Sequence, residues 1–189
     1  MSEEVTPQSG AIILLNGASS SGKSTLARYL QAVLNEPFLH LSSDQLVDGG
    51  AIPNRRNESE LFAWPGSMRT RFFDGFHRCI PAMAAAGNNL VVEHIIEFPD
   101  WRDELRCLLD GFDVFLVGVH CDLGELDRRE AARGDRALGE GRTHVEVDGI
   151  HGFGAYDLEV DTTSGVSFSM AEHVAIAWLG RAPRGALFR

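Results

Sequence analysis

Short apolar runs alternate along this chain with longer stretches in which apolar residues recur every three or four positions. A short apolar run bounded by turn residues predicts a buried strand, and the longer spacing predicts an amphipathic helix. The run at 11–15 contains no polar residue, which is typical of a strand covered on both faces of a parallel sheet. Strands are predicted at residues 11–15, 38–41, 89–96, 112–119 and 156–160.

The helical patterns fall between these strands. Pro81 lies inside the second of them, and we expect it to kink or divide that helix. Helices are predicted at residues 23–34, 68–86, 101–109, 123–133 and 168–179. Strands and helices therefore alternate, which predicts an α/β fold with right-handed crossovers. The expected architecture is a single doubly wound domain, with a five-stranded parallel sheet flanked by helices.

The length of 189 residues suits one such domain and is too short for two. We place the domain at residues 10–180, between an N-terminal tail at 1–9 and a C-terminal tail at 181–189. Two stretches inside it are less regular. Residues 45–78 are expected to form an acceptor-binding insertion, and residues 123–154 a lid region in which 143–154 is loop.

Charge and composition narrow the class of partner. The net charge of −10 argues against non-specific binding to nucleic acid, which depends on neutralising phosphates with Lys and Arg. No apolar run approaches the length of a membrane span, and the acidic start of the chain is unlike a signal peptide. Cys79, Cys107 and Cys121 are too scattered for a disulfide framework and are expected to be buried thiols. These features indicate a cytoplasmic protein.

The strongest chemical signal directly follows the first predicted strand. Gly17-Ala-Ser-Ser-Ser-Gly-Lys-Ser24 fits the Walker A pattern G-x-x-x-x-G-K-[ST], which wraps nucleotide phosphates. In this pattern the lysine reaches the β- and γ-phosphates, the final hydroxyl ligates Mg²⁺, and the following helix adds its N-terminal dipole. The motif predicts a P-loop NTPase or kinase that uses ATP and Mg²⁺. The predicted nucleotide-binding residues are Gly17, Ala18, Ser19, Ser20, Ser21, Gly22, Lys23, Ser24 and Thr25.

Two carboxylates follow predicted strands and should therefore face the same crevice as the phosphate loop. Asp44 follows the second strand and is the candidate catalytic base for an acceptor hydroxyl. It could instead cap the turn that follows, or act as an indirect partner of Mg²⁺. Glu93 lies near the end of the third strand, where it could hold Mg²⁺ through water or contact the acceptor. His94 is expected to be structural.

An arginine set follows the fourth strand. Arg129, Arg133 and Arg136 are spaced at i, i+4 and i+7 and therefore share one face of a helix. Guanidinium groups suit phosphate oxygens, so Arg133 and Arg136 are candidate catalytic residues and Arg129 a candidate nucleotide contact. The alternative is a solvated helix face in which Glu130 and Asp135 pair with these arginines.

The acceptor-binding insertion is irregular and contains embedded aromatic residues. Loops of this length in compact domains are usually functional or disordered. The aromatic side chains favour substrate binding, although they could simply cover the core. The candidate acceptor contacts are Asp48, Phe62, Trp64, Arg69 and Glu93.

Several of these blocks occur together in one known family. The relevant residues are Asn16–Ser24, Leu41-Ser-Ser-Asp44, Val117–Asp122, Arg129–Arg136 and Tyr156–Thr163. In these blocks the sequence resembles the chloramphenicol phosphotransferase family, small P-loop kinases that phosphorylate an antibiotic hydroxyl with ATP. The resemblance implies that Asp44 is the base, that Arg133 and Arg136 act at the transferred phosphate, and that Lys23 and Ser24 contact nucleotide and Mg²⁺. It also implies a small hydroxylated acceptor.

The chain departs from that family at two places. Glu93-His94 stands where the family ends its third strand with two aspartates, and residues 49–78 show little likeness. Arginines in this segment, at positions 55, 56, 69 and 71, would suit a phosphorylated acceptor. A zeta-toxin-like kinase of a sugar nucleotide is therefore the alternative. Further alternatives are a nucleotide-controlled binding switch without an acceptor and, against the acidic balance, a nucleic-acid end kinase.

Overall fold

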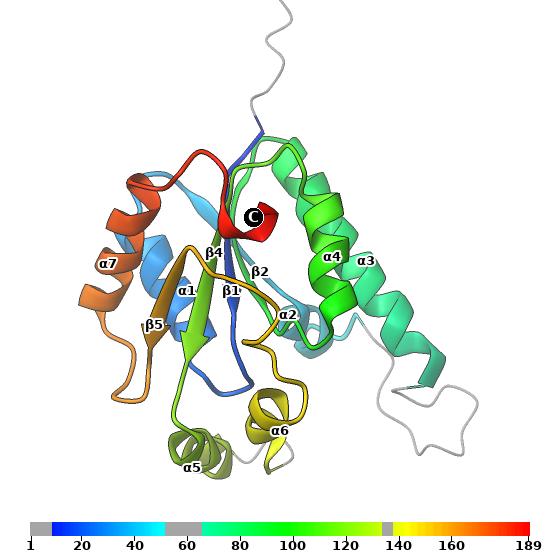
Figure 1. Cartoon of the computed structure of the whole chain (residues 1–189), viewed down its shortest axis with the longest axis vertical. Coiled ribbons are helices and arrows are strands. Elements are labelled where there is room, and N and C mark those ends of the chain that lie inside the picture. The colour runs from blue at the N-terminus through cyan, green and yellow to red at the C-terminus, as the bar shows by residue number, and fades with distance from the viewer. Residues whose placement is uncertain (1–8, 52–65, 134–137) are drawn as a thin grey trace, which may run out of the picture.

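Five parallel strands form the central sheet in the part of the chain that the structure describes, residues 9–51, 66–133 and 138–189 of a computed structural model (Figure 1). The order across the sheet is β2-β3-β1-β4-β5. The strands are β1 (Ile12–Asn16), β2 (Phe38–Ser42), β3 (Asn89–His94), β4 (Val114–His120) and β5 (Leu158–Asp161). The predicted fold class is confirmed.

The register brings the carboxyl ends of the central strands to one edge. Asn16 at the end of β1 lies opposite His94 on β3 and Gly118 on β4. All five residues of β1 are buried, as its uninterrupted apolar run predicts. The side chains of Ile13 and Leu15 join one core cluster, and those of Ile12 and Leu14 join the other.

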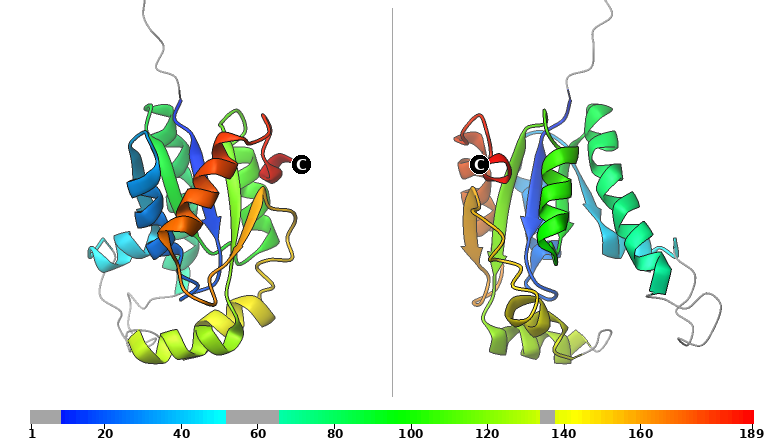
Figure 2. Two further views of the ribbon diagram at one scale, coloured as in Figure 1. Left: turned by 90° about the vertical axis from the view of Figure 1, so that its left-hand side faces the viewer. Right: turned by 45° about the vertical axis from the view of Figure 1, so that its right-hand side comes forward.

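Helices cover both faces of the sheet (Figures 1 and 2). One core cluster contains buried residues of α1 and α7, and the other contains buried residues of α3 and α4. The short helices α5 and α6 lie together beyond the carboxyl ends of the strands. The helices are α1 (Lys23–Val33), α2 (Ser43–Asp48), α3 (Gly66–Ala85), α4 (Pro99–Leu108), α5 (Leu123–Arg133), α6 (Glu140–Glu146) and α7 (Phe168–Leu179). None of those in the described ranges is long and apolar enough to span a membrane.

The structure differs from the sequence-based expectation in several elements. Helix α3 continues through Pro81 and is not divided there. The buried side chains of Phe76, Ile80 and Ala84 pack on the sheet on either side of the proline, which offsets its cost of about 3 kcal/mol in a helix. Part of the segment expected to be loop or lid forms helix α6.

The end of the chain packs on the folded domain, although the sequence analysis predicts a C-terminal tail from residue 181. A 3₁₀ turn at Ala186–Phe188 buries the side chains of Ala186 and Leu187. The Asp157 carboxylate accepts hydrogen bonds from the Ala186 N–H at 2.7 Å and from the Leu116 N–H at 2.8 Å. These bonds attach the chain end to β4 and to the start of β5.

The cysteines were expected to be buried, and this is wrong. Cys79 and Cys107 are exposed, and Cys121 is half-buried. Cys79 lies on α3 and Cys107 on α4, and both helices turn only one stripe of side chains toward the sheet. The two thiols lie on the opposite, solvent-facing sides.

Candidate active site

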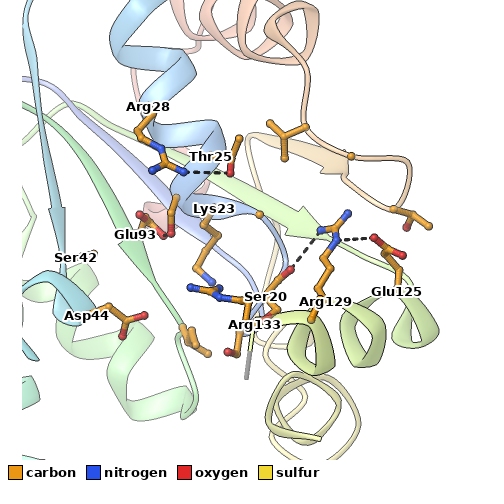
Figure 3. Close-up of a pocket in the computed structure, with 18 of the residues that line it drawn as sticks. Ser20, Lys23, Thr25, Arg28, Ser42, Asp44, Glu93, Glu125, Arg129 and Arg133 are labelled. Carbon is orange, nitrogen blue, oxygen red and sulfur yellow. Dashed lines mark hydrogen bonds and ion pairs between the residues drawn. The ribbon is translucent and has the colours of Figure 1, made fainter. Parts of the chain in front are cut away.

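A cavity of about 710 Å³ opens at the carboxyl ends of the strands (Figure 3). Its walls come from the loop after β1 with the start of α1, the start of α2, the end of β3, helix α5, and the loop 163–166 that follows β5. Ligands of open parallel sheets bind at this edge, outside the carboxyl ends of the strands. The cavity therefore joins segments that are widely separated in the sequence.

The phosphate loop has the backbone shape that its glycines predict. Gly22 has φ of +93°, a left-handed conformation that residues with a side chain rarely adopt. A Cβ at Gly17 would lie 2.4 Å from the Val119 carbonyl oxygen, so only glycine fits there. Both invariant glycine positions of the motif are thus required by the local geometry. Of the predicted nucleotide residues, Ser19, Ser20, Gly22, Lys23, Ser24 and Thr25 line the cavity, whereas Gly17, Ala18 and Ser21 do not.

The interior of this loop is built for an anion. The buried ammonium of Lys23 donates to the carbonyl oxygens of Gly17 at 2.8 Å and Ala18 at 2.7 Å. The hydroxyls of Ser20 and Ser21 are buried and have no hydrogen-bond partner among the described residues. Buried polar groups in this state need a ligand or water to satisfy them. Phosphate oxygens, which accept hydrogen bonds, fit these donors.

A candidate cation site adjoins the loop. The Ser24 hydroxyl donates to Glu93 Oε2 at 2.8 Å, and Glu93 is buried at the end of β3. No group of three His, Cys, Asp or Glu side chains that could hold a metal alone occurs within the described ranges. A hydroxyl and one carboxylate suit Mg²⁺, which keeps several waters and takes its remaining oxygens from substrate phosphates. The residues present therefore fit Mg²⁺ bound together with a nucleotide.

Asp44 lies across the cavity from the phosphate loop, at the second position of α2. The helix is capped by Ser42, whose hydroxyl accepts from the Gln45 N–H at 3.1 Å. The alternative that Asp44 caps this turn is therefore wrong. Figure 3 shows the side chains of Asp44, Lys23 and Arg133 extending toward the same space.

The arginines of α5 form another wall of the cavity. Arg129 donates to the carbonyl oxygens of Thr162 at 2.6 Å and Ser20 at 3.3 Å, and its Nε donates to Glu125 at 2.7 Å. It therefore connects the phosphate loop to the loop after β5. Hydrogen bonds from Arg128 and then Arg129 lower the pKa of the Glu125 carboxyl to about 2.

Sequence reasoning predicted part of this wall. Arg129 and Arg133 line the cavity as expected, and Arg136 lies outside the described residues. Arg28 and Arg128 also line it and were missed, as was the loop 163–166. The position of Arg28 one turn into α1, directly after the phosphate loop, is the signal that could have identified it.

Helix α6 contacts the phosphate loop but does not line the cavity. The Ser19 N–H donates to Nδ1 of His144 at 3.3 Å. The carboxylate of Glu130, which is fully buried, accepts from the N–H groups of Gly139 at 2.8 Å and Gly141 at 2.6 Å. The alternative in which Glu130 pairs with arginines on a solvated helix face does not describe this residue. Glu130 instead fixes the start of α6 to α5.

The predicted acceptor contacts divide into three groups. Glu93 lines the cavity, whereas Asp48 and Arg69 are not among the described residues that do so. The Arg69 guanidinium binds both carboxylate oxygens of Glu97, at 2.7 and 2.6 Å, and lies over the rings of Phe73 and Trp101. Phe62 and Trp64 lie outside the described residues.

His94 is buried at the end of β3 and is among the residues that line the cavity. Its Nε2 lies 2.9 Å from Nε2 of His77, and its ring stacks on Trp101. Burial, together with the proximity of His77 and Lys23, holds the pKa of His94 well below its ordinary value. The ring is therefore neutral near pH 7 and does not act as a cation in the cavity.

The parallel sheet, the phosphate loop and the cavity that they form define a P-loop kinase. Residues 10–179 match the family described as chloramphenicol phosphotransferase-like protein, and the chain belongs to this family. It is similar to a Mycobacterium tuberculosis protein, Rv2636, that is provisionally named an O-phosphotransferase. The two are 29% identical over 173 residues, which cover 82% of this chain and 76% of the relative. The chain is accordingly an enzyme, a kinase of the O-phosphotransferase type.

Two solved structures with the same fold are kinases of small molecules. The M. tuberculosis APS kinase CysC, in complex with AMPPNP and APS, superposes with a TM-score of 0.66 at 20% identity, covering 93% of this chain and 100% of that chain. Shikimate kinase from Acinetobacter baumannii, in complex with shikimate, gives 0.63 at 16% identity, covering 92% and 95%. At these identities the likeness shows the fold alone.

Proposed function

We propose that this protein is an ATP- and Mg²⁺-dependent O-phosphotransferase. It transfers the γ-phosphate of ATP to a hydroxyl of a small molecule, and a chloramphenicol-like antibiotic is the leading acceptor. The observation that carries this proposal is the position of Asp44, whose side chain extends into the same cavity as Lys23 and Arg133. A carboxylate placed across from a phosphate loop suits deprotonation of an incoming hydroxyl.

The nucleotide would occupy the side of the cavity formed by the phosphate loop, α5 and the loop 163–166. Lys23 would exchange its two carbonyl partners for the β- and γ-phosphate oxygens. The unsatisfied hydroxyls of Ser20 and Ser21 and the N–H groups around them would bind the same phosphates. Ser24 and Glu93 would hold Mg²⁺, which when bound neutralises charge on the phosphate oxygens.

The chemical step follows from this placement. Asp44 accepts the proton of the acceptor hydroxyl, while the oxygen of that hydroxyl bonds to the γ-phosphorus. The bond between this phosphorus and the bridging oxygen of ADP breaks, and ADP leaves with the bonding electrons. Arg133 faces the region where negative charge would gather, and a preorganised guanidinium there would stabilise the transition state.

The charges of the described residues favour an acceptor without a phosphate group over a sugar nucleotide. Arg69, one of the four arginines that would suit a phosphorylated acceptor, is occupied by Glu97. On the acceptor side, the cavity presents the carboxyl groups of Asp44 and Glu93. These carboxylates would repel a phosphorylated acceptor unless other cations compensated for them.

The test is ADP release by the purified protein with Mg²⁺-ATP and a panel of acceptors. The panel contains chloramphenicol, a sugar nucleotide, a short single-stranded oligonucleotide, and no acceptor. We expect turnover that depends on chloramphenicol and is accompanied by a phosphorylated product in mass spectrometry. Stimulation only by the sugar nucleotide would show that the acceptor is a sugar nucleotide and not a chloramphenicol-like antibiotic. ATP binding without stimulation by chloramphenicol would reject a chloramphenicol-like acceptor, and absence of stimulation by every acceptor tested would favour the nucleotide-controlled switch.

A further inference from the structure

We propose that His40 is a positioning residue for the reaction, which holds Glu93 at the cation site and connects it to the helix that carries Asp44. This inference rests on the proposed function. His40 lies on β2, which pairs with β3, and its side chain is largely buried. Its Nε2 contacts Glu93 Oε1, and its Nδ1 lies 3.1 Å from the side-chain nitrogen of Gln45.

The hydrogen-bond partners determine where the proton of His40 lies. The Ser42 N–H donates to Gln45 Oε1 at 3.1 Å, so the amide nitrogen of Gln45 is the end that faces His40. An amide nitrogen only donates, and His40 Nδ1 must therefore accept. The proton of the neutral ring then lies on Nε2, from which it is donated to Glu93.

Both oxygens of the Glu93 carboxylate are consequently engaged. Oε1 accepts from His40 and Oε2 accepts from the Ser24 hydroxyl at 2.8 Å. A carboxylate held at both oxygens cannot rotate away from Ser24, so the two cation-binding groups stay together. Partners that orient a metal-binding side chain in this way are typically worth 10–100-fold in metal affinity.

The same chain of hydrogen bonds reaches the proposed base. Gln45 and Ser42 form a reciprocal capping box at the start of α2, in which each side chain bonds to the other residue's backbone N–H. Asp44 is the second residue of this helix. The cation site and the helix that carries the base are therefore positioned by one continuous network.

His40 itself is placed to orient rather than to react. It is not among the residues that line the cavity, and its two ring nitrogens face Glu93 and Gln45. Its effect on the reaction must therefore pass through these neighbours.

The test uses three variants and a readout that needs no acceptor. The side-chain nitrogen of glutamine can replace Nε2 of histidine, and the side-chain oxygen of asparagine can replace Nδ1. His40→Gln therefore keeps the bond to Glu93, His40→Asn keeps only the bond to Gln45, and His40→Phe keeps neither. Affinity for Mn²⁺ is measured on the full chain with ADP, from the electron paramagnetic resonance signal of free Mn²⁺. ADP binding without metal is measured in parallel.

We expect His40→Asn and His40→Phe to weaken Mn²⁺ binding about tenfold or more, and His40→Gln to stay within about threefold of the wild type. ADP binding without metal should not change. His120→Asn is the matched control. His120 also pairs with a glutamate, Glu159 at 2.7 Å, but this pair lies on β4 and β5, away from β2 and β3 in the strand order. Loss of the His120 side chain should leave Mn²⁺ affinity unchanged.

Equal Mn²⁺ affinity in the wild type and the three His40 variants would overturn the inference while leaving the phosphotransferase proposal intact. Weakening of His40→Gln to the level of His40→Asn would also overturn it. If His40→Phe fails to fold, as shown by thermal unfolding, the difference between the other two variants decides. A wild type that turns over an acceptor without a divalent cation would overturn both this inference and the Mg²⁺ part of the proposed function.

Discussion

The two sides of the cavity are built in different ways. The nucleotide side comes mainly from continuous segments, namely the phosphate loop with α1, helix α5 and the loop 163–166. The acceptor side brings together side chains from the ends of two neighbouring strands, with Asp44 following β2 and Glu93 on β3. Phosphate binding is therefore a property of local sequence, whereas acceptor chemistry depends on tertiary arrangement.

The charges of the two sides differ as well. The cations Lys23, Arg28, Arg128, Arg129 and Arg133 line the nucleotide side, where the one acidic residue, Glu125, pairs with Arg128 and Arg129; Asp44 and Glu93 line the other side. Such a separation attracts phosphate to one side only and leaves a carboxylate available for a hydroxyl on the other. Changes on the nucleotide side should thus affect every acceptor alike, and a change at Asp44 should leave nucleotide binding intact.

The largest expected effect tests this separation at Asp44. Asp44→Asn removes the proton acceptor and should lower kcat about 10³-fold, while the Kd for ATP stays within about threefold. The measurements are ADP release and calorimetric ATP binding. Asp48→Asn removes a carboxylate one turn further along α2, away from the cavity, and should keep kcat within about twofold. Equal losses in the two variants would show that charge on α2, rather than the position of Asp44, is responsible.

A change on the nucleotide side should have the opposite signature. Lys23→Ala removes a preorganised donor to the phosphates and should lower kcat/KM for ATP about 10²–10³-fold with every acceptor. Arg28→Ala is the matched control, because it removes a positive charge from the same wall but outside the phosphate loop. We expect it to cost less than about fivefold. An effect of Lys23→Ala that differs strongly from one acceptor to another would contradict the functional separation of the two sides of the cavity.

A smaller effect is expected at the capping box. Gln45→Ala removes the side chain that bonds to the Ser42 N–H and to His40, and should lower the free energy of unfolding by about 1 kcal/mol. Urea unfolding measures this change. Asp48→Ala, at the other end of the same helix, should stay within about 0.5 kcal/mol of the wild type. A Gln45 variant as stable as the wild type would mean that the box contributes nothing to α2.

A pH-dependent effect is expected in the framework that both sides share. Burial, with the proximity of His120 and Lys23, lowers the pKa of His151 to about 4, and its Nδ1 bonds to the Tyr156 hydroxyl at 2.8 Å. The unfolded chain therefore binds a proton at this histidine between pH 6.5 and 4, and the folded chain does not. Its contribution to stability is complete above pH 6.5 and decreases as the pH falls toward 4.

The measurement is the free energy of unfolding across this pH range for the wild type and for His151→Gln. We expect the wild type to lose more stability between pH 6.5 and 4, because the variant has no proton to gain at this position. Parallel curves would show that His151 does not contribute.

Much of the fold was predictable because it depends on local pattern. The apolar runs locate all five strands, and helices α5 and α7 occupy the predicted residues. The phosphate loop was predictable for the same reason, since its glycines are required by the turn itself. Asp44 could be placed in the cavity because the carboxyl ends of parallel strands share one edge.

The rest depends on contacts between residues far apart in the chain. His40 and Glu93 are 53 positions apart, and nothing in either local sequence indicates that they meet. In the local sequence, Glu130 has the pattern of one member of a charged helix face. The N–H groups that donate to its carboxylate belong to Gly139 and Gly141, at the start of another helix. The attachment of the chain end likewise depends on Asp157, which bonds to the Ala186 N–H 29 positions away.

The buried Glu130 carboxylate also joins α5 and α6 into one unit. Separating the two helices would leave this buried group without the two N–H groups that satisfy it, at a cost of several kcal/mol. Helix α5 lines the cavity, so α6 adds rigidity to a wall that it does not itself form. A wall fixed in this way has little conformational entropy to lose when a ligand binds against it.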